Sequence, residues 1–497
     1  MAGPGLCGSP WQRRLVRVLG ACSFVLAMLA PTAGAASYDP VVDANSMSST
    51  AQYTGAAAWW DAGYTGKGID VAVIDSGVSP VPALDHPGKV LYGPDLSLES
   101  QAPNLRDYDT YGHGTFMAGL IAGHDNEYRG ISPDARIVSL KVATADGGAD
   151  VSQVIAAIDW VVQHAHDPGL NIRVLNLSYG TNSGQAAGID PLAYAVEQAW
   201  KHGIVVVASA GNTGYQRGGN APGLADPAYN PFVIAVGASD SMGTPATKDD
   251  RVASFSASSA GCGSCKNPDL LAPGAHLQGL RVGNSWIDAH HAEGVIDDTY
   301  FRGSGSSQSA ALMSGAVALV LQKYPTMSPD LVKRFFATKA VKLASFDSQA
   351  QGAGELRLGA MLNATPQWSY TGQNFAAANG SGSLEQSRGS DHVTRDGVTL
   401  TGDQDIFGKP VDEAGLAQAE ASSSSWSGNN WNGSTWSASS WSASSWSGST
   451  WSASSWSASS WSGSTWSAST WSASTWSGSS WSGSSWSGQS WASAGWG

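Results

Sequence analysis

Five short apolar runs constrain the fold of this chain more than any other feature of its sequence. The runs are rich in β-branched residues and lie at 69–74, 137–142, 174–177, 204–208 and 233–236. Such runs are typical of strands buried on both faces of a parallel sheet. The segments between them carry apolar residues at helical spacing, for example from Val151 to Val162. Strands that alternate with helices predict an α/β layer fold.

Three short motifs place an acid, an imidazole and a hydroxyl along this pattern. Asp75 ends the first apolar run, His113 lies in Gly-His-Gly-Thr, and Ser307 opens a helix of small residues. Each motif alone has an ordinary explanation: a turn, a loop histidine or a small residue at a helix start. Together they are the parts of a nucleophilic acyl-transfer site, and Asp, His, Ser is one of the few orders known for it. Ligands of parallel sheets bind at the carboxyl ends of strands, where Asp75 is expected.

Residues 1–36 have the pattern of a signal peptide. Arg13, Arg14 and Arg17 precede the apolar stretch 18–29, and small residues that offer a cleavage site follow it. A membrane anchor is the alternative, but a span needs roughly 20 apolar residues and this stretch is shorter. The Arg pair leaves the twin-arginine export route open. We therefore expect a secreted, extracellular protein with no membrane span after signal removal.

The charge balance excludes some classes of partner. The chain has 26 Lys and Arg against 39 Asp and Glu, a formal net charge of −13. This argues against nucleic acid or an anionic membrane as a partner. An acidic surface that maintains solubility is the ordinary explanation, and a monomer is expected.

Two cysteines, Cys262 and Cys265, remain once the signal peptide is removed. In an exported protein this Cys-x-x-Cys pattern allows a redox pair, half of a zinc site or a local disulfide. Zinc needs two further ligands, and no nearby histidine has a supporting spacing. A disulfide between Cys262 and Cys265 fits an oxidising compartment better, and no metal site is predicted.

A tryptophan recurs every fifth residue from Trp426 to Trp496, fifteen in all, and no charged residue follows Glu420. A period of five matches neither the two-residue repeat of a strand nor the 3.6-residue repeat of a helix. Residues 426–497 are therefore predicted to be a disordered, low-complexity tail, preceded by a polar linker at 361–425. One alternative is a flexible set of aromatic faces that stack on cell-wall polysaccharide. Another is a pentapeptide β-solenoid, whose interior is small for an indole.

Residues 53–337 resemble the subtilisin-like serine peptidases, the subtilase family, in short segments that occur in family order. The matching segments are 63–66, 71–77, 113–115, 118–119, 130–135, 176–180, 210–212, 233–238, 271–274 and 303–315. The resemblance implies a three-layer sandwich in which helices flank a mostly parallel central sheet, within a peptidase domain at 37–360. It also implies a secreted bacterial serine endopeptidase that acts on polypeptides.

The resemblance assigns roles to residues that match the family's motifs. Ser307 is the expected nucleophile at a helix N-terminus, His113 the general base, and Asp75 the acid that orients the imidazole. Asn212 matches the amide of the oxyanion hole. The resemblance also allows a structural calcium ion, although no acidic loop has a recognisable ligand spacing, and no other cofactor is expected.

Two further segments match the edges that hold an extended substrate in the family. They are Ser178-Tyr179-Gly180 and Gly147-Gly148-Ala149. A substrate backbone that joins such edges binds as an added strand, and its main-chain hydrogen bonds supply affinity. These two segments are therefore the expected substrate-binding edges.

The sequence departs from the family pattern near the nucleophile and at the N-terminus. Gln308 and Ala311 stand where the family has Met and Pro, and the loss of a proline inside a helix is no handicap. Only 38 residues separate Ala36 from Asp75. The inhibitory pro-domain usual in the family is therefore expected to be missing.

A second hypothesis makes the protein chiefly a cell-surface or wall-binding protein. It would bind through the tail at 426–497, and its peptidase domain would be secondary. The tryptophan repeat motivates this hypothesis, whereas the complete set of triad residues and Asn212 argue against it.

Overall fold

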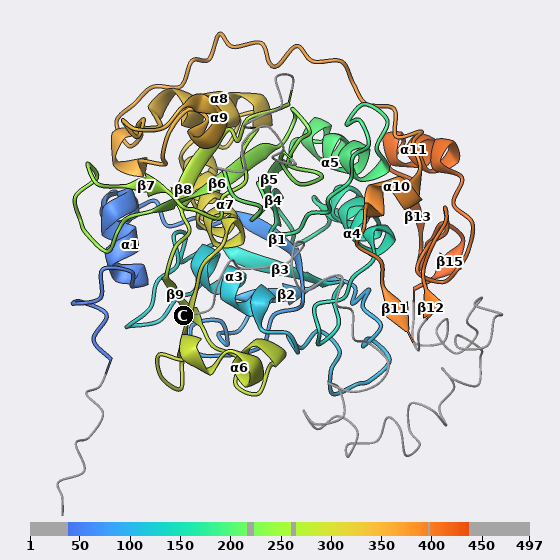
Figure 1. Cartoon of the computed structure of the whole chain (residues 1–497), viewed down its shortest axis with the longest axis horizontal. Coiled ribbons are helices and arrows are strands. Elements are labelled where there is room, and N and C mark those ends of the chain that lie inside the picture. Colours follow the sequence, from blue (N-terminus) through green and yellow to red (C-terminus); the bar gives the residue numbers. More distant parts are fainter. Residues whose placement is uncertain (1–37, 216–222, 260–264, 396–397, 437–497) are drawn as a thin grey trace, which may run out of the picture. The chain divides into compact units, whose positions relative to one another are not determined.

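Eight strands of the peptidase domain form one central sheet, as a computed structural model shows. The structure describes residues 38–215, 223–259, 265–395 and 398–436. The predicted signal peptide at 1–36 lies outside the described residues. The strand order is β2-β3-β1-β4-β5-β6-β7, with β8 also paired to β6 (Figure 1). The strands are β1 (Asp70–Asp75), β2 (Val90–Tyr92), β3 (Arg136–Lys141), β4 (Ile172–Leu177), β5 (Val205–Ser209), β6 (Ile234–Asp240), β7 (Arg251–Val252) and β8 (Leu270–Pro273). Within this sheet only β7 runs antiparallel to its neighbour.

Strand β1 is buried along its whole length and lies between β3 and β4. Val71, Ala72, Val73 and Ile74 are at most 1 % exposed, as expected of a strand covered on both faces. After β1 the chain forms β2 and β3 on one side of that strand, and it then crosses to β4 on the other side. The direction of the strand order therefore reverses at β1. In open α/β sheets the crevice at such a point, outside the carboxyl ends of the strands, binds ligands, and Asp75 ends β1 there.

Helices cover both faces of the sheet, which confirms the predicted α/β sandwich. On one face α3 (His113–Ala122) and α7 (Ser306–Lys323) pack on each other and against β1 (Figure 1). On the other face α4 (Val151–His164) and α5 (Pro191–Lys201) pack on each other, as right-handed crossovers require. All residues of α3 are buried, in accord with its apolar sequence on every side.

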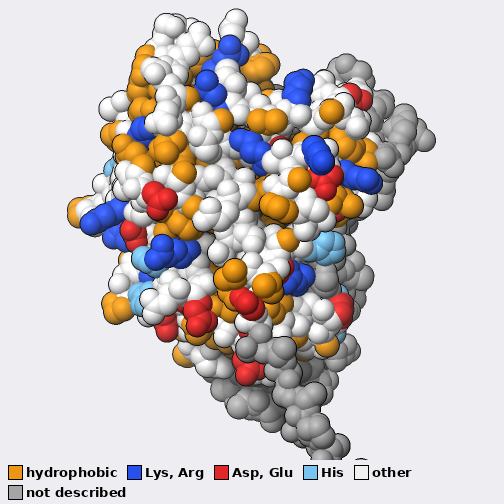
Figure 2. All heavy atoms as spheres, turned by 90° about the vertical axis from the view of Figure 1, so that its left-hand side faces the viewer, with side chains coloured by type: hydrophobic (Ala, Val, Ile, Leu, Met, Phe, Trp, Pro, Cys, Tyr) orange, Lys and Arg blue, Asp and Glu red, His pale blue; other side chains and the backbone are white. Residues whose placement is uncertain are grey.

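Smaller elements surround the sandwich. They are α1 (Met47–Thr54), α2 (Ala56–Asp61), β9 (Leu277–Leu280), α6 (Trp286–His290), η2 (Ala292–Gly294), β10 (Tyr300–Gly303), α8 (Pro329–Lys339), α9 (Ser348–Gln351) and η3 (Leu358–Ala360). Helix α1 packs on β9 and α2 on η3, so these early residues are part of the domain itself. Figure 2 shows basic side chains interspersed with acidic ones on one face of the molecule. In the described part of the chain, no helix has both the length and the apolar character that a membrane crossing requires.

The structure differs from the expected polar linker at 361–425, because this region packs on the domain. It contains α10 (Leu384–Arg388), the two-stranded pair β11 (Thr394–Arg395) and β12 (Val398–Thr399), and α11 (Glu413–Ala421). Helix α10 contacts α4 and α5, and α11 contacts α5. Much of the contact is polar, so the apolar periodicity that would reveal a helix in the sequence is weak here.

The first three tryptophans of the repeat also differ from the predicted disordered tail. They lie in a three-stranded meander of β13 (Trp426–Ser427), β14 (Asn430–Trp431) and β15 (Ser434–Thr435). Trp426 and Trp431 face each other across the first pair of strands, and Trp436 follows the third. The strands begin at residues 426, 430 and 434, with two-residue turns between them, so the tryptophan shifts by one position from each strand to the next. The sequence argument considered one continuous strand or helix and missed this arrangement.

The indoles of Trp426 and Trp431 are buried against α4. Nε1 of Trp426 donates to the carbonyl of Ala156 at 2.8 Å, and Nε1 of Trp431 donates to Oδ2 of Asp159 at 2.7 Å. Trp431 is fully buried, and its ring and that of Trp436 meet edge to face. The first part of the repeat is therefore a packed element of the domain. The predicted tail from residue 437 onward lies outside the described residues.

Candidate active site

Asp75 and His113 form a buried pair at the carboxyl end of β1. Nδ1 of His113 lies 2.8 Å from Oδ1 and 3.0 Å from Oδ2 of Asp75. The two residues are 0 % and 1 % exposed, respectively. A carboxylate in this position fixes the imidazole ring and favours the tautomer with hydrogen on Nδ1, which makes Nε2 the basic atom. Burial raises the pKa of Asp75 above its ordinary value, and His113 opposes that rise.

Two glycines around His113 allow the first turn of α3 to approach β1. Gly112 has a φ of 102°, a conformation that residues with a Cβ rarely adopt. A Cβ on Gly114 would lie 2.2 Å from the carbonyl oxygen of Gly77. The Gly-His-Gly sequence is therefore required by the close contact that brings the imidazole to Asp75.

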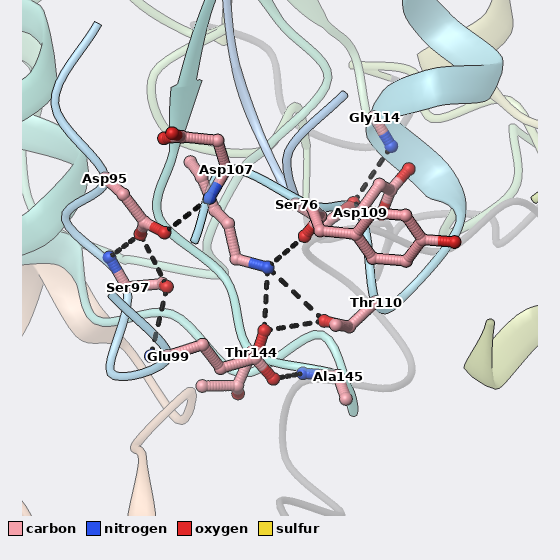
Figure 3. Close-up of polar contacts among 12 residues, drawn as sticks. Ser76, Asp95, Ser97, Glu99, Asp107, Asp109, Thr110, Gly114, Thr144 and Ala145 are labelled. Atoms are coloured by element: carbon pink, nitrogen blue, oxygen red, sulfur yellow. Dashed lines mark hydrogen bonds and ion pairs between the residues drawn. The ribbon is translucent and has the colours of Figure 1, made fainter. Parts of the chain in front are cut away.

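Asp109 connects the turn after β1 with the start of α3 (Figure 3). Its Oδ1 accepts hydrogen bonds from the hydroxyl of Ser76 at 2.8 Å and the N–H of Gly112 at 2.7 Å. Its Oδ2 accepts from the N–H of Thr115 at 2.7 Å, and the N–H of Gly114 donates to the Ser76 hydroxyl at 2.9 Å. Asp109 was not predicted, and the signal that could have revealed it is an Asp four residues before the histidine. Because both segments share this carboxylate, it holds the acid and the imidazole in register.

Ser307 is the second residue of α7 and is 2 % exposed. Its hydroxyl donates to the carbonyl of Ser178 at 3.2 Å, and its own carbonyl accepts from the Ser178 hydroxyl at 3.1 Å. Helix α7 packs on α3, whose first residue is His113. The fold thus packs on each other two helices, one that begins with an imidazole and one that carries a hydroxyl in its first turn.

Asn212 follows β5 and contacts the start of α7. The N–H of Ser306 donates to Oδ1 of Asn212 at 2.9 Å, and the N–H of Gly211 donates to the Ser306 hydroxyl at 3.1 Å. With its oxygen held in this way, the carboxamide has its amino group beside the N-terminus of α7. Side-chain and backbone N–H groups at such a helix end are suited to stabilise a developing oxyanion.

A small cavity of about 40 Å³ lies next to Asn212. It is lined by Thr181, Asn182, Ser183, Gly211, Asn212, Thr213, Gly223, Leu224 and Ala225. The segments that follow β4 and β5 both contribute to its walls.

The two predicted substrate edges follow β3 and β4, the two strands that flank β1 in the sheet. Residues 147–149 follow β3, and residues 178–180 follow β4. Gly147 has a φ of 83°, which explains why the tight bend there needs glycine. Tyr179 is 0 % exposed as a whole residue, and the other residues of the two edges are buried as well.

A buried ion pair ties the first edge to the turn before His113 (Figure 3). Nζ of Lys141 lies 2.7 Å from Oε2 of Glu99, and each side chain is at most 1 % exposed. Oε1 of Glu99 accepts the N–H of Ala145 at 2.8 Å, and Oε2 accepts the hydroxyl of Thr110 at 2.7 Å. Sequence reasoning missed both charges, because Lys141 lies in an apolar run and Glu99 belongs to no motif.

Cys265 is disulfide-bonded, and its partner lies outside the described residues. The pairing with Cys262 therefore stays a prediction. Within the residues that the structure covers, no cluster of three or more His, Cys, Asp or Glu side chains is placed to hold a metal ion.

The parallel sheet, the Asp75–His113 pair and a serine at a neighbouring helix start are the features of one class of serine hydrolase. The subtilase family model matches residues 66–358, more than half of the chain, and the chain belongs to this family. It is 35 % identical over 300 residues to the serine protease AprX of Bacillus subtilis (strain 168), a match that covers 58 % of this chain and 65 % of that relative. It is 32 % identical over 294 residues to subtilisin DY of Bacillus licheniformis, covering 59 % and 90 %. The chain thus spans slightly less than two thirds of AprX and most of subtilisin DY.

Proposed function

We propose that this chain is a secreted serine endopeptidase that hydrolyses peptide bonds through an acyl-enzyme on Ser307. The observation that carries the proposal is the buried contact between Asp75 and His113 beside the helix that begins at Ser306. Membership of the subtilase family supports the same reaction. Secretion rests on the pattern of residues 1–36 alone.

In the proposed reaction Nε2 of His113 removes the proton from Ser307 as Oγ attacks the scissile carbonyl carbon. The negative charge on the carbonyl oxygen is stabilised by the side-chain amide of Asn212 and the N-terminal end of α7. The C–N bond then breaks while His113 returns the proton to the leaving amine. Water, activated by the same imidazole, hydrolyses the ester, and Asp75 stays ionised to stabilise the imidazolium.

A serine-reactive fluorophosphonate probe tests this assignment, with casein hydrolysis as a second measurement. The wild type should be labelled, and Ser307→Ala should lose both the label and hydrolysis. Ser309→Ala is a matched control, because Ser309 lies in the same helix and its hydroxyl donates to the carbonyl of Ala272 at 2.9 Å. It should keep the label. Equal labelling of wild type and Ser307→Ala would remove Ser307 from the role of nucleophile.

The alternative of a wall-binding protein gains no support from the first tryptophans of the repeat. The indoles of Trp426, Trp431 and Trp436 are at most 8 % exposed and cannot stack on a sugar without leaving the domain. Sedimentation with cell walls, with and without residues 437–497, tests the rest of the repeat. Loss of wall binding with retained hydrolysis would make those residues an anchor for an enzyme.

A further inference from the structure

Residues 383–393, a segment of the C-terminal region, contact the residues that follow the two predicted substrate edges. It lies beyond residue 358, where the match to the family ends. On one side it contacts Asp150, which directly follows the edge at 147–149. On the other side it contacts Thr181, which directly follows the edge at 178–180. The same short segment therefore contacts the residue that directly follows each edge.

Arg388 makes the contact with the first edge and is fully buried. Its Nε lies 2.6 Å from Oδ2 of Asp150, and its Nη2 lies 3.3 Å from Oδ1. The remaining donors reach the carbonyls of Gly402 and Gln404 and the carboxylate of Glu385. A planar guanidinium held at every donor has one geometry only, and a buried charge cannot leave its partner without a large cost. Asp150 is therefore fixed relative to this segment.

Asp150 also caps helix α4, directly after the edge at 147–149. Its carboxylate accepts the N–H of Ser152 at 3.0 Å and caps the start of α4. Its own N–H donates to the side chain of Gln153 at 2.6 Å, which completes a capping box. The residue thus joins the edge at 147–149, the helix α4 and Arg388 at a single point.

The contact with the second edge is made by backbone and small polar side chains. The hydroxyl of Thr181 donates to the carbonyl of Ser387 at 2.6 Å. The N–H of Ser390 donates to Oδ1 of Asn182 at 2.7 Å, and Nδ2 of Asn182 donates to the Ser390 hydroxyl at 2.6 Å. Between these contacts, Gly389 has a φ of 62°, and a Cβ there would lie 2.2 Å from Oδ1 of Asn182. The approach at this point is so close that no side chain fits.

The side chain of Tyr179 lies between the two sets of contacts. Burial raises the pKa of its hydroxyl well above the ordinary value, the carboxylates of Asp150 and Asp391 add to that rise, and Arg388 opposes it. Charged groups of both the domain and the segment therefore lie near Tyr179, which belongs to the second edge.

We propose that residues 383–393, anchored by Arg388, are a positioning element that sets the separation and register of the two substrate edges. The inference rests on the proposed function and deepens it, because it concerns the recognition of extended polypeptides. A substrate that reaches several residues from the scissile bond binds both edges as an added strand. Binding energy from those distant residues raises turnover only when the edges are already in place. A short substrate that occupies only the reacting centre does not use the element.

The test compares acyl-amide substrates of one residue and of four residues that share the same residue at the scissile bond. Arg388→Met removes the anchor, and Arg357→Met is its matched control, because Arg357 also has buried ion pairs, with Asp250 and Glu355, but contacts neither edge. Arg388→Met should lower kcat/KM for the four-residue substrate about tenfold more than for the one-residue substrate. Arg357→Met should change both substrates alike.

Gly389→Ala provides a second variant that keeps every charge. Its added methyl group should displace Asn182 and produce the same length-dependent loss. Gly243→Ala is its control, because Gly243 has a similar φ of 67°, a Cβ there would meet no atom within 4 Å, and it lies in the loop between β6 and β7, away from both edges. If Arg388→Met does not fold, Gly389→Ala against Gly243→Ala decides the question.

Two results separate the inference from the proposed function. A wild type that takes up no phosphonate at Ser307 contradicts the proposed function itself. A labelled wild type whose Gly389→Ala variant, folded by near-ultraviolet circular dichroism, retains the wild-type ratio between the two substrates overturns the positioning element. Equal losses for both substrates overturn it as well, because they indicate a purely structural role.

Discussion

The backbone N–H of Ser306 donates a hydrogen bond to Oδ1 of Asn212 at 2.9 Å. This contact joins the loop after β5 to the first turn of the helix that carries Ser307. It gives the oxygen of the carboxamide a structural partner. In the proposed mechanism the amino group of the same side chain stabilises the oxyanion.

Asn212→Asp should separate the structural contact of this side chain from its proposed role in the oxyanion hole. Aspartate keeps an oxygen for the N–H of Ser306 and loses the N–H donor that would stabilise the oxyanion. We expect kcat to fall by about 10²–10³-fold with little change in KM, a magnitude that is known from a subtilisin and is borrowed for this chain. Steady-state kinetics on a peptide amide measures it. Wild-type turnover in Asn212→Asp would contradict the oxyanion role.

The Glu99–Lys141 pair should contribute strongly to stability, because removal of one partner leaves a buried charge alone. We expect Lys141→Met to lower the free energy of unfolding by about 3–5 kcal/mol, measured by urea denaturation in the Ser307→Ala background to avoid self-digestion. The double variant with Glu99→Gln should recover part of this loss. Lys342→Met, at an exposed site, is the control and should change stability by less than about 0.5 kcal/mol. Equal stability of the two lysine variants would disprove the importance of the pair.

The docking of the first tryptophan repeats should depend on Trp431. This side chain is fully buried and donates to Asp159, so Trp431→Ala should cost about 3–5 kcal/mol of unfolding free energy. Trp368→Ala is the matched control, because Trp368 is 52 % exposed, and it should cost far less. Thermal unfolding of both variants in the Ser307→Ala background makes the comparison. A loss no greater than that of the control would show that the repeat does not stabilise the domain.

The same contact predicts a pH dependence. Burial raises the pKa of Asp159 to about 7, and the pKa of Glu420 beside it is also raised by burial and by Asp159. Between the ordinary pKa of an Asp, near 4, and about 7, the folded state binds more protons than the unfolded chain. Stability should therefore decrease as the pH rises through this window and stay at the lower level above it.

Asp159→Asn removes the titrating carboxyl and keeps an oxygen for Nε1 of Trp431. We expect it to raise the unfolding temperature at pH 8 by about 2 °C or more and to reduce the dependence of that temperature on pH. Scanning calorimetry between pH 4 and 8 measures both effects. Asp167→Asn, an exposed site near the end of α4, should change neither. A pH profile of Asp159→Asn identical to that of the wild type would refute the assignment.

Local sequence patterns predicted five of the eight strands of the central sheet, namely β1, β3, β4, β5 and β6. Strand β1 is covered on both faces, so its burial requires only that almost every residue be apolar, and this is visible in the sequence. The motifs around Asp75 and His113 were visible for a similar reason. Glycines and small residues are needed wherever two backbones approach, as Gly114 approaches Gly77.

Partners that are far apart in the sequence could not be found in this way. Arg388 and Asp150 are separated by 238 positions, and each alone has the appearance of a surface charge. The region around Arg388 was predicted to be a linker because its sequence is polar and lacks the apolar pattern of a strand. Only the folded chain shows that this charge is buried and paired.

By itself, the sequence determined an α/β subtilase-type sandwich and placed an acid, an imidazole and a hydroxyl at the ends of its elements. It could do so because strand burial and close backbone contacts impose rules on single residues and their immediate neighbours. The tertiary structure alone decided that Asp109 and Glu99 hold the site, that Trp431 packs on α4, and that residues 383–393 join both substrate edges. Those features depend on which buried polar groups meet, and a hydrogen bond or ion pair in the interior is defined only when both partners are in place.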